Sequence, residues 1–553
     1  MKAASLVLAC AALAACAPAS PSTAPAPAPA RPAAAPPSAP PAATPAAPAL
    51  REATNNWHLL DPATDGVLGT GVLRAERELL AGRQPRRIVT VAIIDGGVDT
   101  AHAGLRSRLW KNPREVPGNG RDDDNNGFVD DVHGWNFIGA RDGKNVNEDT
   151  FEVTRLAAMC ADSSGAGRAR MPAAYRTRCP EILAELAKKA SEAEQTLQTV
   201  AQIEEMYARI LPVLRRATGS ESLTVARVSA VRVTNDTVRQ ARQIFLGLAQ
   251  QGITESDVAD AKKAYGSRAK YGFNTSFNPR GIVGDDYPDT LVKRYGNADV
   301  TGPDAGHGTH VAGIVGSTRD NDGTGIATGV RIMAIRAVPD GDERDKDVAN
   351  AIRYAVDNGA HIINMSFGKA FSPYKSQVDD AVRYADSKGV LMVHAAGNDG
   401  EDATTHASFP TPEYVSGGRA ANWIEVGATS WKGPDSLVAS FSNYGKTKVD
   451  LFAPGEDIYA TVPGGGYKRN SGTSMASPVV AGVAALLMSH YPQLTASDVK
   501  RIILQSSTKR GSQNVARPGE AGGMVRFSEL SMTGGIVNAY EAVRMAEQMP
   551  PRP

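Results

Sequence analysis

Residues 471–478 read SGTSMASP, and an apolar run over residues 479–488 follows them directly. A glycine-rich stretch precedes them, which is typical of a loop, and the apolar run is typical of a buried helix. Ser474 would therefore lie in the first turn of a helix. Free N–H groups and the positive end of the helix dipole favour developing negative charge there. The alternative is that Thr473, Ser474 or Ser477 is only a helix cap.

Two earlier segments carry the residues that a serine nucleophile requires, namely a base and a carboxylate that orients the base. Residues 91–101 read VAIIDGGVDTA and predict a buried parallel strand with Asp95 at its carboxyl end, where open α/β sheets place ligands. Residues 306–313 read GHGTHVAG and predict a small-residue helix that carries His307. A zinc pair of His307 and His310, or a packed histidine, is the alternative. Zinc pairs on helices usually require an i, i+4 spacing and a nearby acid, and neither is present.

In this order, the segments around Asp95, His307 and Ser474 resemble the subtilisin-like serine peptidases, or subtilases. The resemblance covers roughly residues 85–140 and 280–545, and it implies a serine endopeptidase that acts through a catalytic triad and an acyl-enzyme. One position departs from the family pattern: Gly96 stands where subtilases usually have Ser or Thr. A hydrogen bond that supports the catalytic carboxylate is therefore expected to be missing.

The resemblance also implies an oxyanion hole and a substrate-binding edge. Residues 395–398 read AAGN, and the Asn398 side chain would hold the oxyanion together with the Ser474 amide. Read alone, Asn398 would be a turn residue. The implied substrate-binding residues are Ser366, Phe367, Gly368, Ala395, Ala396 and Gly397. Their backbone could pair with an extended peptide, whereas the alternative is an ordinary strand end, and the small side chains favour a large apolar residue at the cleaved bond.

Strand and helix patterns alternate through the second half of the chain. Strand-like runs occupy residues 330–338, 362–365 and 390–395, and helix-like runs occupy residues 347–358, 376–388 and 535–545. This alternation predicts an α/β fold with a mostly parallel sheet and helices on both faces, which is also the subtilisin-like architecture that the resemblance implies.

Asp95 and His307 lie much further apart in the sequence than in compact subtilases, so we expect a mainly helical insertion over residues 140–277. Apolar residues at helical spacing over residues 182–214 predict a long helix that Pro212 should end or kink. Two more helical patterns follow, over residues 223–248 and from Thr254 to about residue 265. The insertion is either a surface addition without a catalytic role or a lid or exosite that restricts substrates.

The chain begins with residues 1–16, which read MKAASLVLACAALAAC. A lysine before an apolar run too short to span a bilayer is typical of a secretory signal. Residues 13–16 resemble a bacterial lipobox, which implies lipidation of Cys16; an ordinary secreted protein cleaved nearby is the alternative. Residues 17–50 are rich in Pro and Ala and predict a disordered tether. We therefore expect a lipoprotein of the bacterial cell envelope, held in the outer membrane and facing the periplasm or the exterior.

Two cysteines remain after Cys10 leaves with the signal and Cys16 takes lipid. In an oxidising compartment we expect Cys160 and Cys179 to form a disulfide. The predicted remaining parts are a lead-in and first part of the catalytic domain over 51–139, the rest of that domain over 278–545, and a tail over 546–553. The lead-in leaves no room for a prodomain of the family's usual size, so we expect either a different route of activation or an enzyme that folds unaided.

Residues 121–131 read RDDDNNGFVDD and alternate oxygen-bearing side chains around a glycine. This spacing wraps one hard cation in calcium loops. The predicted ligands are Asp122, Asp124, Asn126, the carbonyl of Phe128, and Asp130 or Asp131. A solvated acidic turn is the alternative, and residues 320–323 (DNDG) are a second, weaker candidate. We expect structural Ca²⁺ and no catalytic cofactor.

The formal net charge is +1, which argues against nucleic acid as a partner. We expect a monomer that acts on a protein or peptide substrate. Two other functions remain open at this point. An inactive homologue that only binds peptides is disfavoured by the intact triad, whereas a subtilase-fold peptide ligase or macrocyclase would use the same residues.

Overall fold

The structure is a computed structural model that describes residues 53–285, 294–320, 322–519 and 522–549. The predicted signal, Cys16 and the tether over 17–50 lie outside the described residues, as does residue 321 of the second calcium candidate. The chain divides into two compact units. The first holds residues 50–191 and 267–553, and the second holds residues 192–266.

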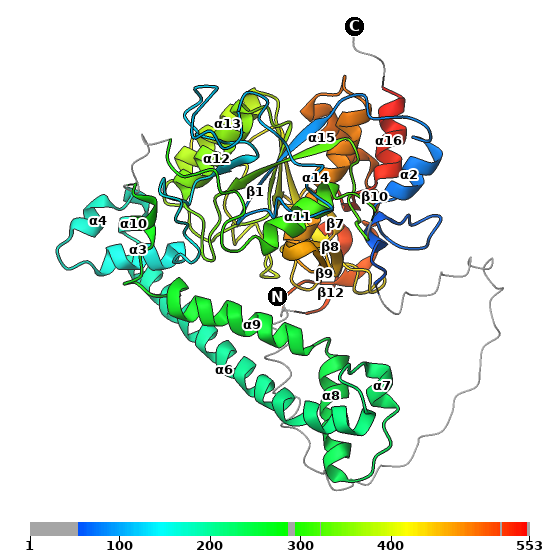
Figure 1. Cartoon of the computed structure of the whole chain (residues 1–553). Coiled ribbons are helices and arrows are strands. Elements are labelled where there is room, and N and C mark those ends of the chain that lie inside the picture. The colour runs from blue at the N-terminus through cyan, green and yellow to red at the C-terminus, as the bar shows by residue number, and fades with distance from the viewer. Residues whose placement is uncertain (1–52, 286–293, 321, 520–521, 550–553) are drawn as a thin grey trace, which may run out of the picture. The chain divides into compact units, whose positions relative to one another are not determined.

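A nine-stranded sheet forms the centre of the first unit (Figure 1). Its strand order is β10-β13-β7-β6-β5-β4-β1-β3-β2, and only β10 and β13 pair antiparallel. The strands are β1 Val89–Asp95, β2 Gly134–Asn136, β3 Val330–Arg336, β4 Ile362–Met365, β5 Leu391–Ala395, β6 Trp423–Thr429, β7 Leu451–Pro454, β10 Thr508–Lys509 and β13 Gly535–Ile536. Two antiparallel pairs lie outside this sheet: β8 Ile458–Val462 with β9 Gly466–Asn470, and β11 Asn514–Ala516 with β12 Met524–Arg526. The predicted mostly parallel sheet is confirmed.

Helices cover both faces of the sheet because its central strands are apolar on both sides. In β1, Val91 and Ile93 belong to a core shared with α11 and α14, whereas Ala92 and Ile94 belong to a core shared with α12 and α13. The main helices are α2 Val72–Glu78, α11 Gly306–Gly316, α12 Asp345–Asp357, α13 Lys375–Ser387, α14 Thr473–His490, α15 Ala496–Ser506 and α16 Ala539–Glu547. The others in this unit are η1 Trp57–Leu59, α3 Glu152–Ala161, α4 Ala166–Arg170, α5 Ala173–Arg176, η2 Arg268–Gly272, α10 Arg280–Val283, η3 Pro463–Gly465 and η4 Phe527–Glu529.

Helix α14 carries Ser474 and passes through the core. Among the described residues it is the one helix long and apolar enough to cross a membrane, and 94% of that stretch is buried inside the protein. Its hydrophobicity is therefore explained by its place against the sheet, where Val479 and Val480 are fully buried.

The second unit is helical. Helix α6 (Cys179–Thr218) begins in the range of the first unit and continues into the second, which also contains α7 Val225–Ser229, α8 Asp236–Gln250 and α9 Glu255–Ser267. Of the two outcomes predicted for Pro212, an end or a kink, the end does not occur, since α6 runs on to Thr218. Ile210, Leu211 and Leu214 are buried in the unit's core, and this packing outweighs the hydrogen bond that proline removes.

Three local predictions can be compared with the structure. Asp257 and Thr254 bond each other at the start of α9, as the predicted capping pattern requires. Cys160 and Cys179 form the predicted disulfide, with Cα atoms 5.6 Å apart. The helix expected over 535–545 is wrong at its beginning, because Gly535–Ile536 form β13 and α16 starts only after Asn538, whose side chain accepts from the amide of Glu541.

Candidate active site

Asp95 and His307 meet at the carboxyl end of β1. Asp95 is the last residue of that strand, and His307 is the second residue of α11. His307 Nδ1 donates to both carboxylate oxygens of Asp95, at 2.8 and 2.9 Å. An ionised carboxylate can only accept, so this contact fixes the proton on Nδ1 and leaves Nε2 able to accept one. The His307 side chain is 46% exposed and the Asp95 side chain 3%.

Backbone atoms support this pair. The amide of Gly96 donates to Asp95 Oδ1 at 2.7 Å, a bond that any non-proline residue at this position could make, whereas glycine has no hydroxyl to add another. A side chain at Gly308 would place its Cβ 2.2 Å from the carbonyl oxygen of Gly97 and 3.0 Å from Asp95 Oδ1. Only glycine therefore lets α11 approach the end of β1 this closely.

The Asp95 carboxylate also changes the acidity of His307. Desolvation of the ring opposes its charged form, but the nearby negative charge and the hydrogen bonds to Asp95 outweigh it, so the pKa of His307 is raised. A raised pKa makes His307 a stronger base, which suits proton abstraction from a hydroxyl.

His310 does not form a metal pair with His307. It is buried, and its Nε2 lies 3.0 Å from the carbonyl oxygen of Lys468. Burial lowers its pKa to about 4, so the ring is neutral at physiological pH. Since His307 Nδ1 is already bound to Asp95, the two rings serve different purposes.

Ser474 is the second residue of α14, and its Oγ donates to the carbonyl oxygen of Ser366 at 3.0 Å. In the register of the sheet, Ile94 lies beside Met365, so Asp95 and Ser366 leave adjacent strands side by side. No hydrogen bond joins Ser474 to His307 among the described residues. The hydroxyl has to turn from Ser366 toward His307, and such bonds are often absent before substrate binds.

Asn398 is oriented by Thr473, the residue before the nucleophile. Its Oδ1 accepts from the Thr473 amide at 2.8 Å and from Thr473 Oγ1 at 3.1 Å. Because an amide N–H can only donate, this contact identifies the oxygen and directs Nδ2 away from Thr473. The N–H of Ser474 lies in the first turn of α14, where it has no partner within the helix. These two groups are the donors that an oxyanion would need.

Asn443 holds the loop that carries Asn398, and the sequence analysis missed it. Its side chain is buried, accepts from the amides of Asp399 and Glu401 at 3.0 Å, and donates to the carbonyl of Ala396 at 3.0 Å. The sequence gives no local signal for this role, because Asn443 reads as one more polar residue in a loop.

The predicted substrate-binding residues differ in how far they are exposed to solvent. Gly368 is exposed, Phe367 and Gly397 are half-buried, and Ser366, Ala395 and Ala396 are buried. Among the described residues, the backbone of Gly368 makes no hydrogen bond, so it is an open edge for an extended peptide. Ser366 instead supports the nucleophile: its Oγ donates to the carbonyl of Ser474 at 2.9 Å.

A hollow of about 280 Å³ lies beside this edge. Ser408 and Ala396 line it, and a Cβ at Gly368 would lie 2.2 Å from Ser408 Oγ. The walls also include Lys375, Glu413, Glu425 and Lys448. The structure thus adds charged groups to walls for which the sequence predicted small side chains and room for a large apolar substrate residue.

Lys369 anchors the far end of the edge. Its side chain is 2% exposed, and its Nζ lies 2.9 Å from Glu152 and 2.8 Å from Asp345. Burial opposes the charge on Glu152, but Arg155 and Lys369 outweigh it and lower the pKa of that carboxyl. Glu152 begins α3, so the start of the predicted 140–277 insertion is bonded directly behind the edge.

The predicted calcium loop gathers three carboxylates. One oxygen each from Glu115, Asp122 and Asp124 lies within 4.8 Å of the others. Glu115 stands outside the quoted motif and was missed; it is 8% exposed, and its Oε2 has no hydrogen-bond partner among the described residues. Arg114 lies 2.9 Å from Asp124 and neutralises one of the three negative charges. A buried carboxylate oxygen without a partner fits a hard cation.

The other predicted ligands lie around this cluster. The Asp130 carboxylate accepts from the amides of residues 118, 119 and 120, which occupies it within the loop. Asp131 is buried and accepts from Asn112 at 2.8 Å and from the Tyr354 hydroxyl at 2.6 Å. Asn126 Oδ1 accepts from the amide of Phe128 at 2.8 Å.

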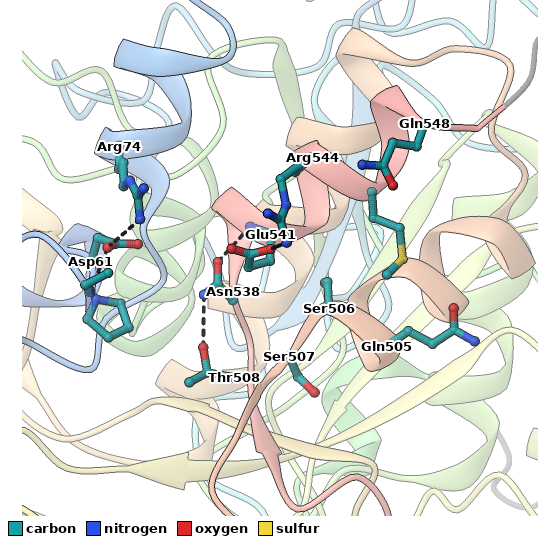
Figure 2. A pocket seen from close by; sticks show the side chains of 13 residues that line it. Asp61, Arg74, Gln505, Ser506, Ser507, Thr508, Asn538, Glu541, Arg544 and Gln548 are labelled. Atoms are coloured by element: carbon teal, nitrogen blue, oxygen red, sulfur yellow. Dashed lines mark hydrogen bonds and ion pairs between the residues drawn. The ribbon is translucent and has the colours of Figure 1, made fainter.

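A second hollow, of about 490 Å³, is lined by residues of α2, α15 and α16 (Figure 2). Its charged side chains pair with one another, Arg74 with Asp61 at 3.2 Å and Arg544 with Glu541 at 2.5 Å. None of the candidate catalytic residues lines it. Its charged groups are already paired, so the chemistry described above belongs to the edge near Ser474.

Comparisons with known proteins point to the family that the motifs resemble. A sequence model described as the subtilase family matches residues 86–522. The thermophilic serine proteinase of Bacillus sp. (strain AK1) is 46% identical over 187 residues, which are 33% of this chain and 42% of that protein. Subtilisin BL of Lederbergia lenta is 36% identical over 212 residues, which are 38% of this chain and 73% of that protein.

The match to the thermophilic proteinase thus spans less than half of that relative's length. Among solved structures, a cold adapted subtilisin-like serine proteinase is 32% identical, with a TM-score of 0.34 over 44% of this chain and 76% of that one.

Proposed function

Because this chain belongs to the subtilase family, we propose that it is a serine endopeptidase that hydrolyses peptide bonds through an acyl-enzyme. The observation that carries the proposal is the double contact of His307 Nδ1 with Asp95. It holds a base, with Nε2 free to accept, at the end of β1. The adjacent strand β4 leads to Ser366, whose carbonyl accepts from Ser474 Oγ.

The proposed reaction follows from these contacts. Ser474 Oγ leaves the carbonyl of Ser366, passes its proton to His307 Nε2 and bonds the scissile carbonyl carbon. Asp95 stabilises the imidazolium, while Asn398 Nδ2 and the Ser474 amide hold the oxyanion. His307 then gives the proton to the nitrogen of the scissile bond. The C–N bond breaks, and the amine product leaves. Water attacks the acyl-enzyme with the same assistance and regenerates the Ser474 hydroxyl.

The test compares the wild-type protein with Ser474→Ala on a mixture of peptides analysed by mass spectrometry. We expect new amino and carboxyl termini with the wild type and a loss of about 10⁶-fold in rate with the variant. Ser489→Ala is the matched control, since it makes the same change in α14 but at a hydroxyl that only bonds the carbonyl of Leu486. Intact peptides with the wild type would indicate a binding homologue, and joined or cyclised products would indicate a ligase.

We further propose that Cys16 carries the lipid that holds the enzyme in the cell envelope, with residues 17–50 as the tether. The support is the lipobox-like sequence of residues 13–16 alone. If Cys16 is acylated, the N-terminal peptide of the mature protein should have the mass of a peptide that begins with an acylated cysteine. Cys16→Ala should move the protein from the membrane fraction to the soluble fraction. A membrane-bound Cys16→Ala variant would contradict the anchor.

We also propose that the loop over residues 115–131 binds structural Ca²⁺. The support is the buried, unpartnered Oε2 of Glu115 beside Asp122 and Asp124. This carboxylate adds an acidic oxygen to those of the predicted loop ligands. One Arg beside three carboxylates leaves net negative charge that a divalent cation would balance.

Calcium should therefore stabilise the fold, by about 2.7 kcal/mol when its concentration is a hundredfold above Kd. Thermal unfolding with Ca²⁺ and with a chelator measures this as a rise in Tm. Glu115→Gln should lose most of the rise. Asp123→Asn is the matched control, because Asp123 lies in the same loop but outside the cluster and bonds the amide of Val116. A Tm that calcium does not change would contradict the site.

A further inference from the structure

The first unit contains a second histidine–carboxylate pair, buried beneath the substrate-binding edge. His394 lies in β5 and Glu425 in the adjacent strand β6, and the structure pairs these two residues in register. His394 Nδ1 is 2.8 Å from Glu425 Oε1, and His394 Nε2 is 2.9 Å from the carbonyl oxygen of Phe367. Glu425 Oε2 accepts from Trp423 Nε1 at 2.8 Å. The His394 side chain is fully buried.

The bond to Phe367 fixes the orientation of a peptide group. The unit that joins Phe367 and Gly368 is planar, so its C=O and N–H point in opposite directions. His394 holds the Phe367 carbonyl inward. The amide of Gly368 must then point the other way, toward the exposed edge where no described residue bonds it. A substrate strand would accept its hydrogen bond from this amide.

The same geometry sets a requirement on protons. A carbonyl only accepts, so His394 Nε2 has to carry a proton for the bond to exist. Nδ1 faces a carboxyl oxygen, so either the ring carries a second proton or the carboxyl of Glu425 donates one to Nδ1. In both cases the pair holds one proton more than a neutral ring beside an ionised carboxylate.

We propose that His394 and Glu425 form a positioning pair that holds the Phe367–Gly368 peptide so that the Gly368 amide is presented to an extended substrate. The inference rests on the proposed peptidase function and adds a determinant of substrate length. His394 acts through the backbone and does not touch the reacting atoms. Loss of the His394 side chain should weaken the binding of substrates that lie along the edge. Substrates too short to reach the Gly368 amide should depend less on His394.

The kinetic experiment uses two probes with the same residue at the cleaved bond, a tetrapeptide anilide and an acetylated single-residue ester. In His394→Ala, the ratio of kcat/KM between the long and the short probe should fall about tenfold, mainly through KM, which corresponds to one hydrogen bond. His58→Ala is the matched control, because His58 is also fully buried and its Nε2 contacts a backbone carbonyl, that of Thr324. It should leave the ratio unchanged.

Glu425→Gln is the conservative variant. A Gln at 425 can donate its amide N–H to His394 Nδ1, which leaves a neutral ring with its proton on Nε2 and keeps the bond to Phe367. We therefore expect this variant to retain most of the preference for the long probe. A ratio that does not change in His394→Ala, or one that falls equally in His58→Ala, would overturn the proposal.

A spectroscopic readout separates this inference from the proposed function. In protein labelled with ¹⁵N-histidine, the ring signals of His394 are assigned by their absence in His394→Ala. We expect a protonated Nε2 in the wild type and in Glu425→Gln. An unprotonated Nε2 would overturn the positioning role even in an active enzyme. Failure to cleave any peptide, with a protonated Nε2, would instead count against the peptidase function.

Discussion

The protein contains two histidine–carboxylate pairs with the same contact between Nδ1 and a carboxylate oxygen. They differ in the exposure of the ring and in the partner of Nε2. His307 and His394 both place Nδ1 2.8 Å from a carboxylate oxygen, of Asp95 and Glu425 respectively. The His307 side chain is 46% exposed, and its Nε2 has no hydrogen-bond partner among the described residues. The His394 side chain is fully buried, and its Nε2 is bound to the carbonyl of Phe367.

The difference shows what turns such a pair into a catalyst. The carboxylate orients the ring in both cases, but only a ring whose second nitrogen is free and solvent-accessible can take up a proton from a substrate group. A ring that already uses both nitrogens fixes a backbone position instead. The role is therefore decided by what faces Nε2.

Of the two pairs, the exposed pair is expected to have the larger effect on catalysis. Asp95→Asn should lower kcat by about 10⁴-fold, because an amide in this place favours the wrong tautomer of His307. His307 must be neutral to accept a proton, so wild-type activity falls as the pH falls through its raised pKa. Asp95→Asn removes the main cause of that raised pKa, so the residual activity should persist to lower pH. The pH profile of kcat/KM measures both changes.

Glu425→Gln makes the same chemical change in the buried pair and serves as the contrast. It should lower kcat by less than about tenfold, because the ring keeps its bond to Phe367. Equal losses in the two variants would contradict the distinction between the pairs.

An effect between those of Asp95→Asn and Glu425→Gln is expected at the oxyanion donor. Asn398→Ala should lower kcat by about 10²- to 10³-fold with little change in KM, because the Nδ2 donor acts on charge that develops in the transition state. Asn398→Asp is a useful companion, since it keeps the acceptor for the Thr473 amide and replaces the donor. A change in KM alone would show that Asn398 only binds substrate. The effects at the buried pair, about tenfold for His394→Ala and less than that for Glu425→Gln, are the smallest of the series.

The sequence allowed the centre of the fold and the catalytic segments to be predicted because both are local patterns. Strand β4 was predicted with its observed bounds, and Asp95, His307, Asn398 and Ser474 each stand in a short motif. The errors arise where packing outweighs local preference. Pro212 does not end α6, because buried residues on both sides hold the helix together.

The supporting residues could not be predicted because their partners are distant in the chain. Asn443 clamps a loop that lies more than forty positions earlier, and Lys369 bonds Glu152 across the predicted insertion. His394 and Glu425 offered a faint signal, since each is a single ionisable residue within an apolar strand. Their pairing depends on the register between β5 and β6, which a single sequence does not reveal.

The central claim is that Ser474 is the nucleophile activated by His307. The most direct measurement is peptide mapping by mass spectrometry after exposure to a fluorophosphonate, which reacts with activated serine hydroxyls. We predict a single adduct on Ser474 in the wild type, none in Ser474→Ala, and much slower labelling in Asp95→Asn. A folded wild-type protein that stays unlabelled, or that carries the adduct on another residue, would contradict the account.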